Sequence, residues 1–293
     1  MTISRRDVLK ATAAGAAAGM LGCSTESAPA PPPRAPADPP PRLPALFVSH
    51  GSPRQALAED DYAMALRAFA AANFKPQAIV VVSAHWVKRT PVRVTTGGRP
   101  KTIYDFRGFE KALHEFPYPA PGHPALAKDV LARLADEGFT TEADPDRGFD
   151  HGVWVPLSIL YPGAALPVVA VSLPSDLETR DLLRLGRALA PLRDRGALVV
   201  GSGGITHNFD VHGEDPRMRA FDAWTRERLE RMDVEAIADY AKASPDAEYA
   251  HPSTEHWDPV YAVLGAAAAG ERVSHVYEGF RGGFSMRCFA TGA

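Results

Sequence analysis

The chain has 293 residues, of which 45% are hydrophobic and 23% are charged, and its formal net charge is -3 at pH 7. These fractions are ordinary for a globular protein and exclude a collagenous, coiled-coil or mostly disordered chain. A weakly acidic chain offers no basic surface to neutralise a run of phosphates, so we expect no nucleic-acid partner.

The N-terminal segment predicts export. Arg5 and Arg6 precede an apolar run rich in Ala and Gly, and Leu21-Gly22-Cys23 resembles a lipobox. Paired arginines before a mildly apolar region resemble a twin-arginine signal peptide, which we place at residues 1–23. We therefore expect a protein of the periplasm or cell envelope, whose membrane contact is limited to a lipid on Cys23 if that residue is modified.

A proline-rich tether is expected between this signal and the folded domain. Residues 29–44 hold nine of the 27 prolines, a composition that gives an extended chain and no packed core. We place the tether at 24–44 and one folded domain at 45–293. The chain has two cysteines. Lipidation of Cys23 would leave Cys288 unpaired, and we expect Cys288 to be buried as a small hydrophobic side chain.

Strand and helix patterns alternate along the folded part. Short and nearly continuous apolar runs predict buried strands, and apolar residues at helical spacing predict helices. This alternation indicates an α/β fold, a single domain with a mainly parallel central sheet flanked by helices, plus a few additional strands. The predicted strands are 45–49, 78–83, 168–172 and 197–201, with extra or antiparallel strands at 92–95 and 273–280; the predicted helices are 62–72, 124–136, 177–192, 216–232, 234–242 and 258–269.

Three of the ten histidines follow predicted strands. His50 and His85 come directly after the first and second strands, and His207 lies just beyond the strand at 197–201. Because ligands of open α/β sheets bind beyond the carboxyl ends of the strands, these imidazoles can converge. His151 and His256 stand where loops lead into helices.

These five histidines permit two interpretations. A single histidine at such a position is usually a capping or core residue. Five together also fit a site for one divalent transition metal, although no short-spaced metal motif is present. Nucleophile and phosphate-loop patterns are weak around Ser52 and Ser202, and no pattern indicates an organic cofactor.

At these residues the chain resembles the class III extradiol ring-cleavage dioxygenases, in particular the DOPA-dioxygenase type. The matching segments occur in the family's order and span about 45–270. They are Ser49-His50-Gly51-Ser52-Pro53, Ser83-Ala84-His85-Trp86, Asp150-His151-Gly152-Val153-Trp154-Val155-Pro156-Leu157, Gly201-Ser202-Gly203-Gly204-Ile205-Thr206-His207-Asn208 and His251-Pro252-Ser253-Thr254-Glu255-His256-Trp257.

The resemblance implies one non-haem metal ion, Fe(II) for turnover or Zn(II) as found. It implies His50 and His85 as ligands, with His256 as the third where the wider class has a glutamate; the adjacent Glu255 leaves that choice open. His207 is implied as a fourth ligand or as the general base, and His151 as a second acid or base. The implied reaction inserts both atoms of O2 into a catechol-type ring and opens it.

Two other functions remain open from the sequence: a zinc-dependent hydrolase on the same scaffold, and a non-enzymatic lipoprotein that binds phenols or metal. The substrate pocket is expected to use the loops at 99–118 and 145–149. Tyr104, Arg107 and Tyr118 could meet a substrate carboxylate or ring, but we expect them to be surface residues. Trp86, Trp154 and Trp257, close to candidate histidines, are core residues or walls of a pocket for a planar ring.

Overall fold

The computed structural model describes residues 42–72 and 75–293. The expected signal peptide at 1–23, and the tether up to residue 41, lie outside the described residues. Within the part of the chain that is described, no helix is both long and apolar enough to cross a membrane.

A mixed eight-stranded sheet forms the centre of the domain, in the order β4-β3-β5-β2-β6-β1-β10-β7. The four strands β5, β2, β6 and β1 are mutually parallel, whereas β10 and β7 add antiparallel pairs at one edge. The strands are β1 (Ala45–Ser49), β2 (Ala78–Lys88), β3 (Val92–Thr95), β4 (Thr141–Asp144), β5 (Val168–Pro174), β6 (Ala197–Gly203), β7 (Val273–Tyr277) and β10 (Cys288–Thr291), with a separate hairpin of β8 (Phe280–Arg281) and β9 (Phe284–Ser285).

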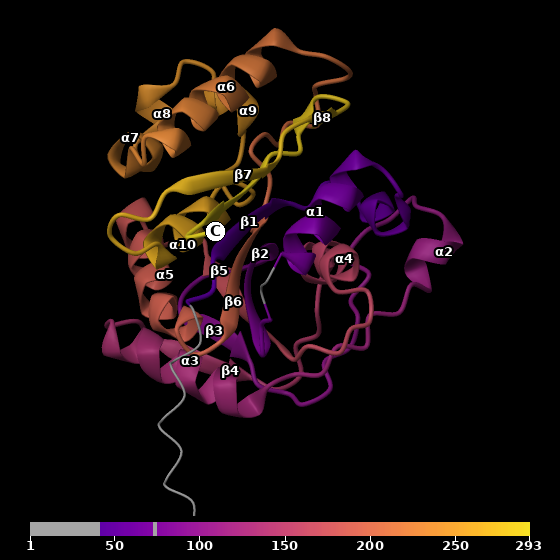
Figure 1. Cartoon of the computed structure of the whole chain (residues 1–293), viewed down its shortest axis with the longest axis vertical. Helices are drawn as coiled ribbons and strands as arrows, with labels where there is room; N and C mark the ends of the chain where they lie inside the picture. The colour runs from indigo at the N-terminus through magenta and orange to yellow at the C-terminus, as the bar shows by residue number, and fades with distance from the viewer. Residues whose placement is uncertain (1–41, 73–74) are drawn as a thin grey trace, which may run out of the picture. The chain divides into compact units, whose positions relative to one another are not determined.

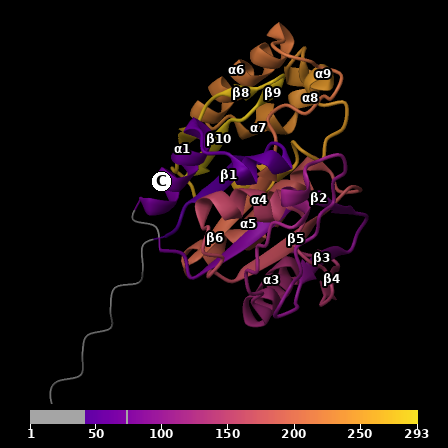
Figure 2. The ribbon, with the colours of Figure 1, turned by 90° about the vertical axis from the view of Figure 1, so that its right-hand side faces the viewer.

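Helices cover both faces of the sheet, as Figure 1 shows. Helices α1 and α4 pack on one face, and α3, α5 and α10 pack on the other, each over its own hydrophobic core. Helices α6 to α9 gather beyond β7 in Figure 1, at the end of the domain that also carries β8 and β9 (Figure 2). The helices are α1 (Asp61–Ala71), α2 (Lys111–His114), α3 (Pro124–Asp136), α4 (His151–Leu160), α5 (Thr179–Arg193), α6 (Pro216–Glu230), α7 (Val234–Ala238), α8 (Tyr240–Ala243), α9 (Ala247–Ala250) and α10 (Pro259–Ala266), with a short 3₁₀ helix at Pro53–Leu57.

The predicted α/β architecture is confirmed, and the central strands explain why. Every residue of β1, β5 and β6 is buried, as expected where helices cover both faces of a parallel sheet. The additional strands expected at 92–95 and 273–280 are β3 and β7, and each makes an antiparallel pair.

Several elements differ from the sequence prediction. Strand β2 continues to Lys88, beyond the predicted end at Ser83, although its pairing with β5 is irregular between Val82 and Val87. The helix expected at 234–242 is divided into α7 and α8 at Asp239. Four-residue elements such as α2 and α9 were not predicted, because one helical turn carries too few residues to show a periodicity.

Candidate active site

Two central strands deliver the first pair of histidines. His50 follows β1, and its backbone N–H donates to Gly203 O over 3.0 Å. His85 lies inside the longer β2, so the expectation that it directly follows the strand is corrected. It still lies beyond Ser83, the last β2 residue in register with β6. Both side chains therefore reach the same edge of the sheet, as predicted.

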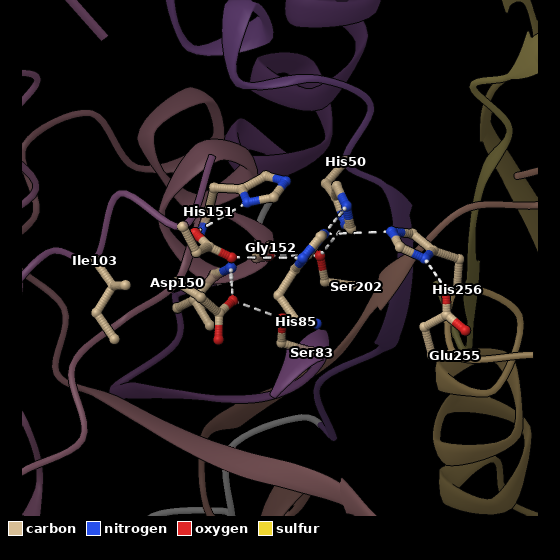
Figure 3. Close-up of polar contacts among 12 residues, drawn as sticks. His50, Ser83, His85, Ile103, Asp150, His151, Gly152, Ser202, Glu255 and His256 are labelled. Atoms are coloured by element: carbon tan, nitrogen blue, oxygen red, sulfur yellow. Dashed lines mark hydrogen bonds and ion pairs between the residues drawn. The ribbon is translucent and has the colours of Figure 1, made fainter. Parts of the chain in front are cut away.

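Three imidazoles point toward one another at this edge (Figure 3). The Nε2 atoms of His50 and His85 are 3.0 Å apart, and those of His85 and His256 are 3.3 Å apart. His256 reaches the cluster because its loop packs against the end of β6. A Cβ at Gly203 would lie 2.0 Å from His256 O, so only glycine allows this approach.

Each of these three rings has an oxygen partner on its Nδ1 side. Ser202 Oγ donates to Gly152 O, so it accepts from His50 Nδ1 over 2.9 Å. His256 Nδ1 donates to Glu255 Oε1 over 3.1 Å. His85 Nδ1 lies 3.5 Å from an Asp105 carboxylate oxygen. With the proton held on Nδ1, each Nε2 presents a lone pair to the cluster.

This donor set fits one metal ion. Neutral imidazoles whose Nε2 lone pairs face one another at such distances repel unless a cation lies between them. Two nitrogens each about 2.1 Å from one ion lie roughly 3.0 to 3.4 Å apart, which matches the observed spacing. Burial and then the neighbouring imidazoles lower the pKa of His50 well below its usual value, so the ring is neutral at pH 7.

His207 joins the cluster in a different way. Its ring stacks on that of His256, with centroids 3.4 Å apart and planes only 8° apart. A ligand nitrogen binds an ion in its own ring plane, so two parallel stacked rings do not direct their lone pairs at the same point. Burial and the nearby His256 lower the pKa of His207 to about 3, so its imidazole is neutral at pH 7.

His151 lies on the other side of His85. It is the first residue of α4, and its ring centroid is 3.8 Å from that of His85. Its Nδ1 is 3.0 Å from Asp105 Oδ1, and its backbone N–H donates to the same carboxylate. Donation from His151 helps to hold the pKa of Asp105 at about 2, against the upward effect of burial. The ligand atoms of His50, His85 and His151 all lie within 4.8 Å of one another, as do those of His207, Glu255 and His256.

A buried carboxylate supports both His85 and His151. Asp150 caps the N-terminus of α4 by accepting from Val153 N, and it also accepts from Ser83 Oγ over 2.7 Å. Arg147 donates to Asp150 Oδ2 over 2.8 Å and to His85 O over 3.3 Å. Sequence analysis missed Asp105, whose histidine partners come from other segments. It also missed Arg147, which lies three residues before Asp150 but contacts His85 O across 62 positions.

A cavity of about 420 Å³ opens onto the imidazoles. The loop at 99–118 contributes to its wall, as predicted, but the loop at 145–149 does not line it. The C-terminal hairpin and the 3₁₀ helix line it instead, and neither was anticipated. The lining residues are Ser49, His50, Gly51, Ser52, Pro53, Gln55, His85, Asp105, Phe106, Phe109, His151, Gly203, Gly204, Thr206, His207, Phe209, His256, Arg281, Phe284, Ser285 and Met286.

The suggestion that tryptophans wall the pocket is wrong. Trp86, Trp154 and Trp257 are buried in the cores and do not line the cavity. The surface placement of Tyr118 is also wrong, because it is 2% exposed and its hydroxyl donates to Leu157 O. Tyr104 is half-buried and donates to a backbone carbonyl, whereas Arg107 is exposed as expected.

The remaining histidines lie away from the cluster's ligand atoms. His212 is exposed, and His275 contacts Arg287 in an ion-pair network. His251 is buried, and its Nε2 donates to Ile205 O over 2.8 Å beneath the His207 loop. Cys288 is buried in β10 as expected, and burial raises the pKa of its thiol to about 12.

Comparison with known proteins agrees with this fold and cluster. Residues 43–286 match the family described as the catalytic LigB subunit of aromatic ring-opening dioxygenase. The chain therefore belongs to the LigB family and is an extradiol aromatic ring-opening dioxygenase. Dioxygenases of this family use a single metal, and the histidine cluster is able to bind one.

Individual relatives extend over most of the chain. A 4,5-DOPA dioxygenase extradiol of Beta vulgaris is 38% identical over 247 residues, covering 81% of this chain and 92% of its own length. A protein of the same description from Escherichia coli K12 is 36% identical over 255 residues, covering 84% and 93%. The crystal structure of an uncharacterized protein from Escherichia coli K12 is 32% identical, with a TM-score of 0.73, and covers 86% of this chain and 100% of that one.

The N-terminal segment also has a match. Residues 2–22 match the twin-arginine translocation (TAT) pathway signal sequence. This match supports export across the membrane, in agreement with the expectation from Arg5 and Arg6.

Proposed function

We propose that this enzyme opens the ring of a catechol-type substrate with O2 at a single metal ion held by His50, His85 and His256. The observation that carries the proposal is the convergence of three Nε2 atoms. His85 Nε2 lies 3.0 Å from His50 Nε2 and 3.3 Å from His256 Nε2, and the Nδ1 atom of each ring faces an oxygen. Carboxylates or hydroxyls behind ligating histidines are the usual means of fixing ring orientation in metal sites.

His256 is proposed as the third ligand in preference to Glu255. Glu255 Oε1 accepts from His256 Nδ1, so the carboxylate lies behind the imidazole and not beside the other two Nε2 atoms. The pKa of Glu255 is lowered to about 2, chiefly by this hydrogen bond, so the carboxylate is charged and orients His256.

The metal, Fe(II) for turnover or Zn(II) as found, would supply open positions at which catechol and dioxygen meet. His207 is proposed to accept a proton from a catechol hydroxyl, because it is neutral and lines the cavity beside His256. His151, oriented by Asp105 from the opposite side, is proposed to return a proton as the ring opens. Both oxygen atoms enter the product, a muconate semialdehyde, and no organic cofactor is required.

We further propose that the mature protein resides in the periplasm or cell envelope. A signal peptide at 1–23 and a tether at 24–44 would precede the catalytic domain at 45–293, with a lipid on Cys23 as the only membrane contact. We expect globomycin to block processing of the signal peptide, and we expect the N-terminal peptide to carry the mass of a lipid. The Cys23→Ser variant should lose both properties. A mature N-terminus elsewhere than Cys23 contradicts the anchor.

The activity is tested on protein purified without oxygen. We expect about one metal ion per chain by elemental analysis. After Fe(II) reconstitution, unsubstituted catechol should consume one O2 per ring and form a yellow semialdehyde. Air oxidation should abolish turnover, and Fe(II) should restore it. Two results contradict the proposal. One is a fully metallated protein that consumes no O2 with catechols. The other is a zinc-loaded protein that hydrolyses esters in air as well as the Fe(II)-loaded protein does.

A further inference from the structure

Aromatic and aliphatic side chains dominate the cavity away from the imidazoles. Phe209 and Phe284 contact each other with centroids 5.6 Å apart, and Phe209 also packs 4.7 Å from His207. Phe106 and Phe109 form a second pair, 5.2 Å apart, on the His151 side. Two aromatic pairs therefore flank the histidine cluster, one on each side.

Polar lining side chains are largely engaged with the protein itself. Ser49 Oγ donates to Arg287 O, and Ser285 Oγ donates to Asp222. Thr206 Oγ1 accepts from a backbone N–H. Gln55 differs: its Nε2 is buried and has no hydrogen-bond partner among the described residues. This amide can donate a hydrogen bond to a substrate acceptor, but it brings no positive charge to offset a carboxylate.

One cationic side chain, Arg281, occurs in the described lining, and it is already paired. Its Nη2 donates to Asp60 over 2.9 Å and to Asp61 over 2.7 Å. One guanidinium with two carboxylates leaves a local net charge of -1. A substrate carboxylate placed there would meet two like charges, and desolvating it without a free cation is costly.

We propose that the cavity selects catechols whose ring substituent is uncharged and mainly apolar, and disfavours substituents that carry a carboxylate. The inference rests on the proposed ring-opening function and names its substrate class. The curated relatives described as 4,5-DOPA dioxygenases are named for a substrate with a charged amino-acid side chain, so this chain would differ from them in preference.

A matched pair of substrates tests the proposal on the Fe(II)-loaded enzyme. 4-Butylcatechol and 3-(3,4-dihydroxyphenyl)propionate have side chains of nearly equal length and differ in charge. By oxygen uptake, kcat/KM should be at least about tenfold higher for 4-butylcatechol, because its added methylenes leave water for an apolar wall. Equal or higher kcat/KM for the propionate overturns the proposal.

Variants at an exposed wall residue sharpen this test. Phe209 is 73% exposed, so its replacement should not disturb the core. Phe209→Ala should reduce several-fold the ratio of kcat/KM for 4-butylcatechol to kcat/KM for 3-(3,4-dihydroxyphenyl)propionate. Phe209→Arg should reduce this ratio further by adding a cation. Met64→Ala, at an exposed apolar residue outside the cavity, is the matched control and should leave the ratio unchanged. If neither Phe209 variant changes this ratio of kcat/KM values, the cavity wall at Phe209 does not determine the substrate preference.

Unsubstituted catechol separates the two proposals. If the metal-loaded enzyme does not cleave it, the proposed function fails. If catechol is cleaved and the propionate is preferred, the ring-opening function stands and the substrate class inferred here is wrong.

Discussion

The two halves of the histidine cluster are built differently. His50 and His85 come from β1 and β2, whose backbones are fixed by the central sheet. His207 and His256 come from loops, and their position depends on Gly203, on the hydrogen bond of His207 N to Ala250 O, and on ring stacking. The rigid half suits the holding of an ion, and the loop-borne half adds both the third proposed ligand, His256, and His207 for proton transfer.

The strand-borne half should show the largest effect. His50→Ala removes one of three converging nitrogens, and we expect metal content below about one-tenth of wild type with catechol turnover reduced more than about 10³-fold. Elemental analysis and oxygen uptake measure both, and exposed His212→Ala serves as the control. A variant that keeps both metal and turnover shows that this half is not the metal site.

The loop-borne half is tested by His207→Ala. Loss of a positioned base should lower kcat about 10²- to 10⁴-fold while the metal remains bound. Elemental analysis and oxygen uptake together distinguish a proton-accepting role of His207 from a role as metal ligand. Loss of the ion together with activity would make His207 a ligand and would erase its functional distinction from His256.

Asp105 is the support that joins His151 to His85. Asp105→Asn keeps the shape but removes the charge, so we expect kcat to fall about 10- to 100-fold, with little change in KM and an altered pH profile of kcat. Asp210→Asn, at an exposed loop carboxylate, is the control. An unchanged pH profile would reduce Asp105 to a purely structural contact.

The smallest effect concerns His251 beneath the loop-borne half. Burial lowers its pKa to about 4, from about 6.5 in an unfolded chain. Between these values the unfolded chain binds a proton here that the folded chain does not, so stability falls as pH drops from about 6.5 to 4. His251→Gln should make the urea-unfolding free energy of the apo protein less pH-dependent, by up to about 1 kcal/mol per pH unit. An identical slope in this variant and in exposed His212→Gln would exclude this contribution.

Sequence reasoning succeeded where a strand carries the information. The apolar runs of β1, β5 and β6 identify buried strands, and the residue that follows β1 is thereby placed at the sheet edge. The predicted end of β2 at Ser83 was too early, but the predicted position of His85 still holds because His85 lies past the end of the pairing between β2 and β6. The sheet's topology then brings His50 and His85 together, whatever their separation in sequence.

Contacts between loops were not predictable in the same way. Asp105 meets His151 across 46 positions, and Arg281 joins the cavity from a two-residue strand near the C-terminus. Neither has a periodicity or a neighbouring motif, because only the tertiary fold brings these segments together. Tryptophans near the histidines in sequence suggested a pocket wall, but phenylalanines form it, and of these Phe209 alone lies close to a candidate histidine in sequence.

The place of β1 in the sheet has a consequence for biogenesis. This strand, which ends at Ser49 just before His50, lies between β6 and β10, and β10 consists of Cys288–Thr291. A ribosome must therefore release almost the whole polypeptide before β1 can gain its second neighbour. We therefore expect the sheet edge beside His50 to be completed at the end of synthesis and before export, an order of events that a pathway for folded cargo permits.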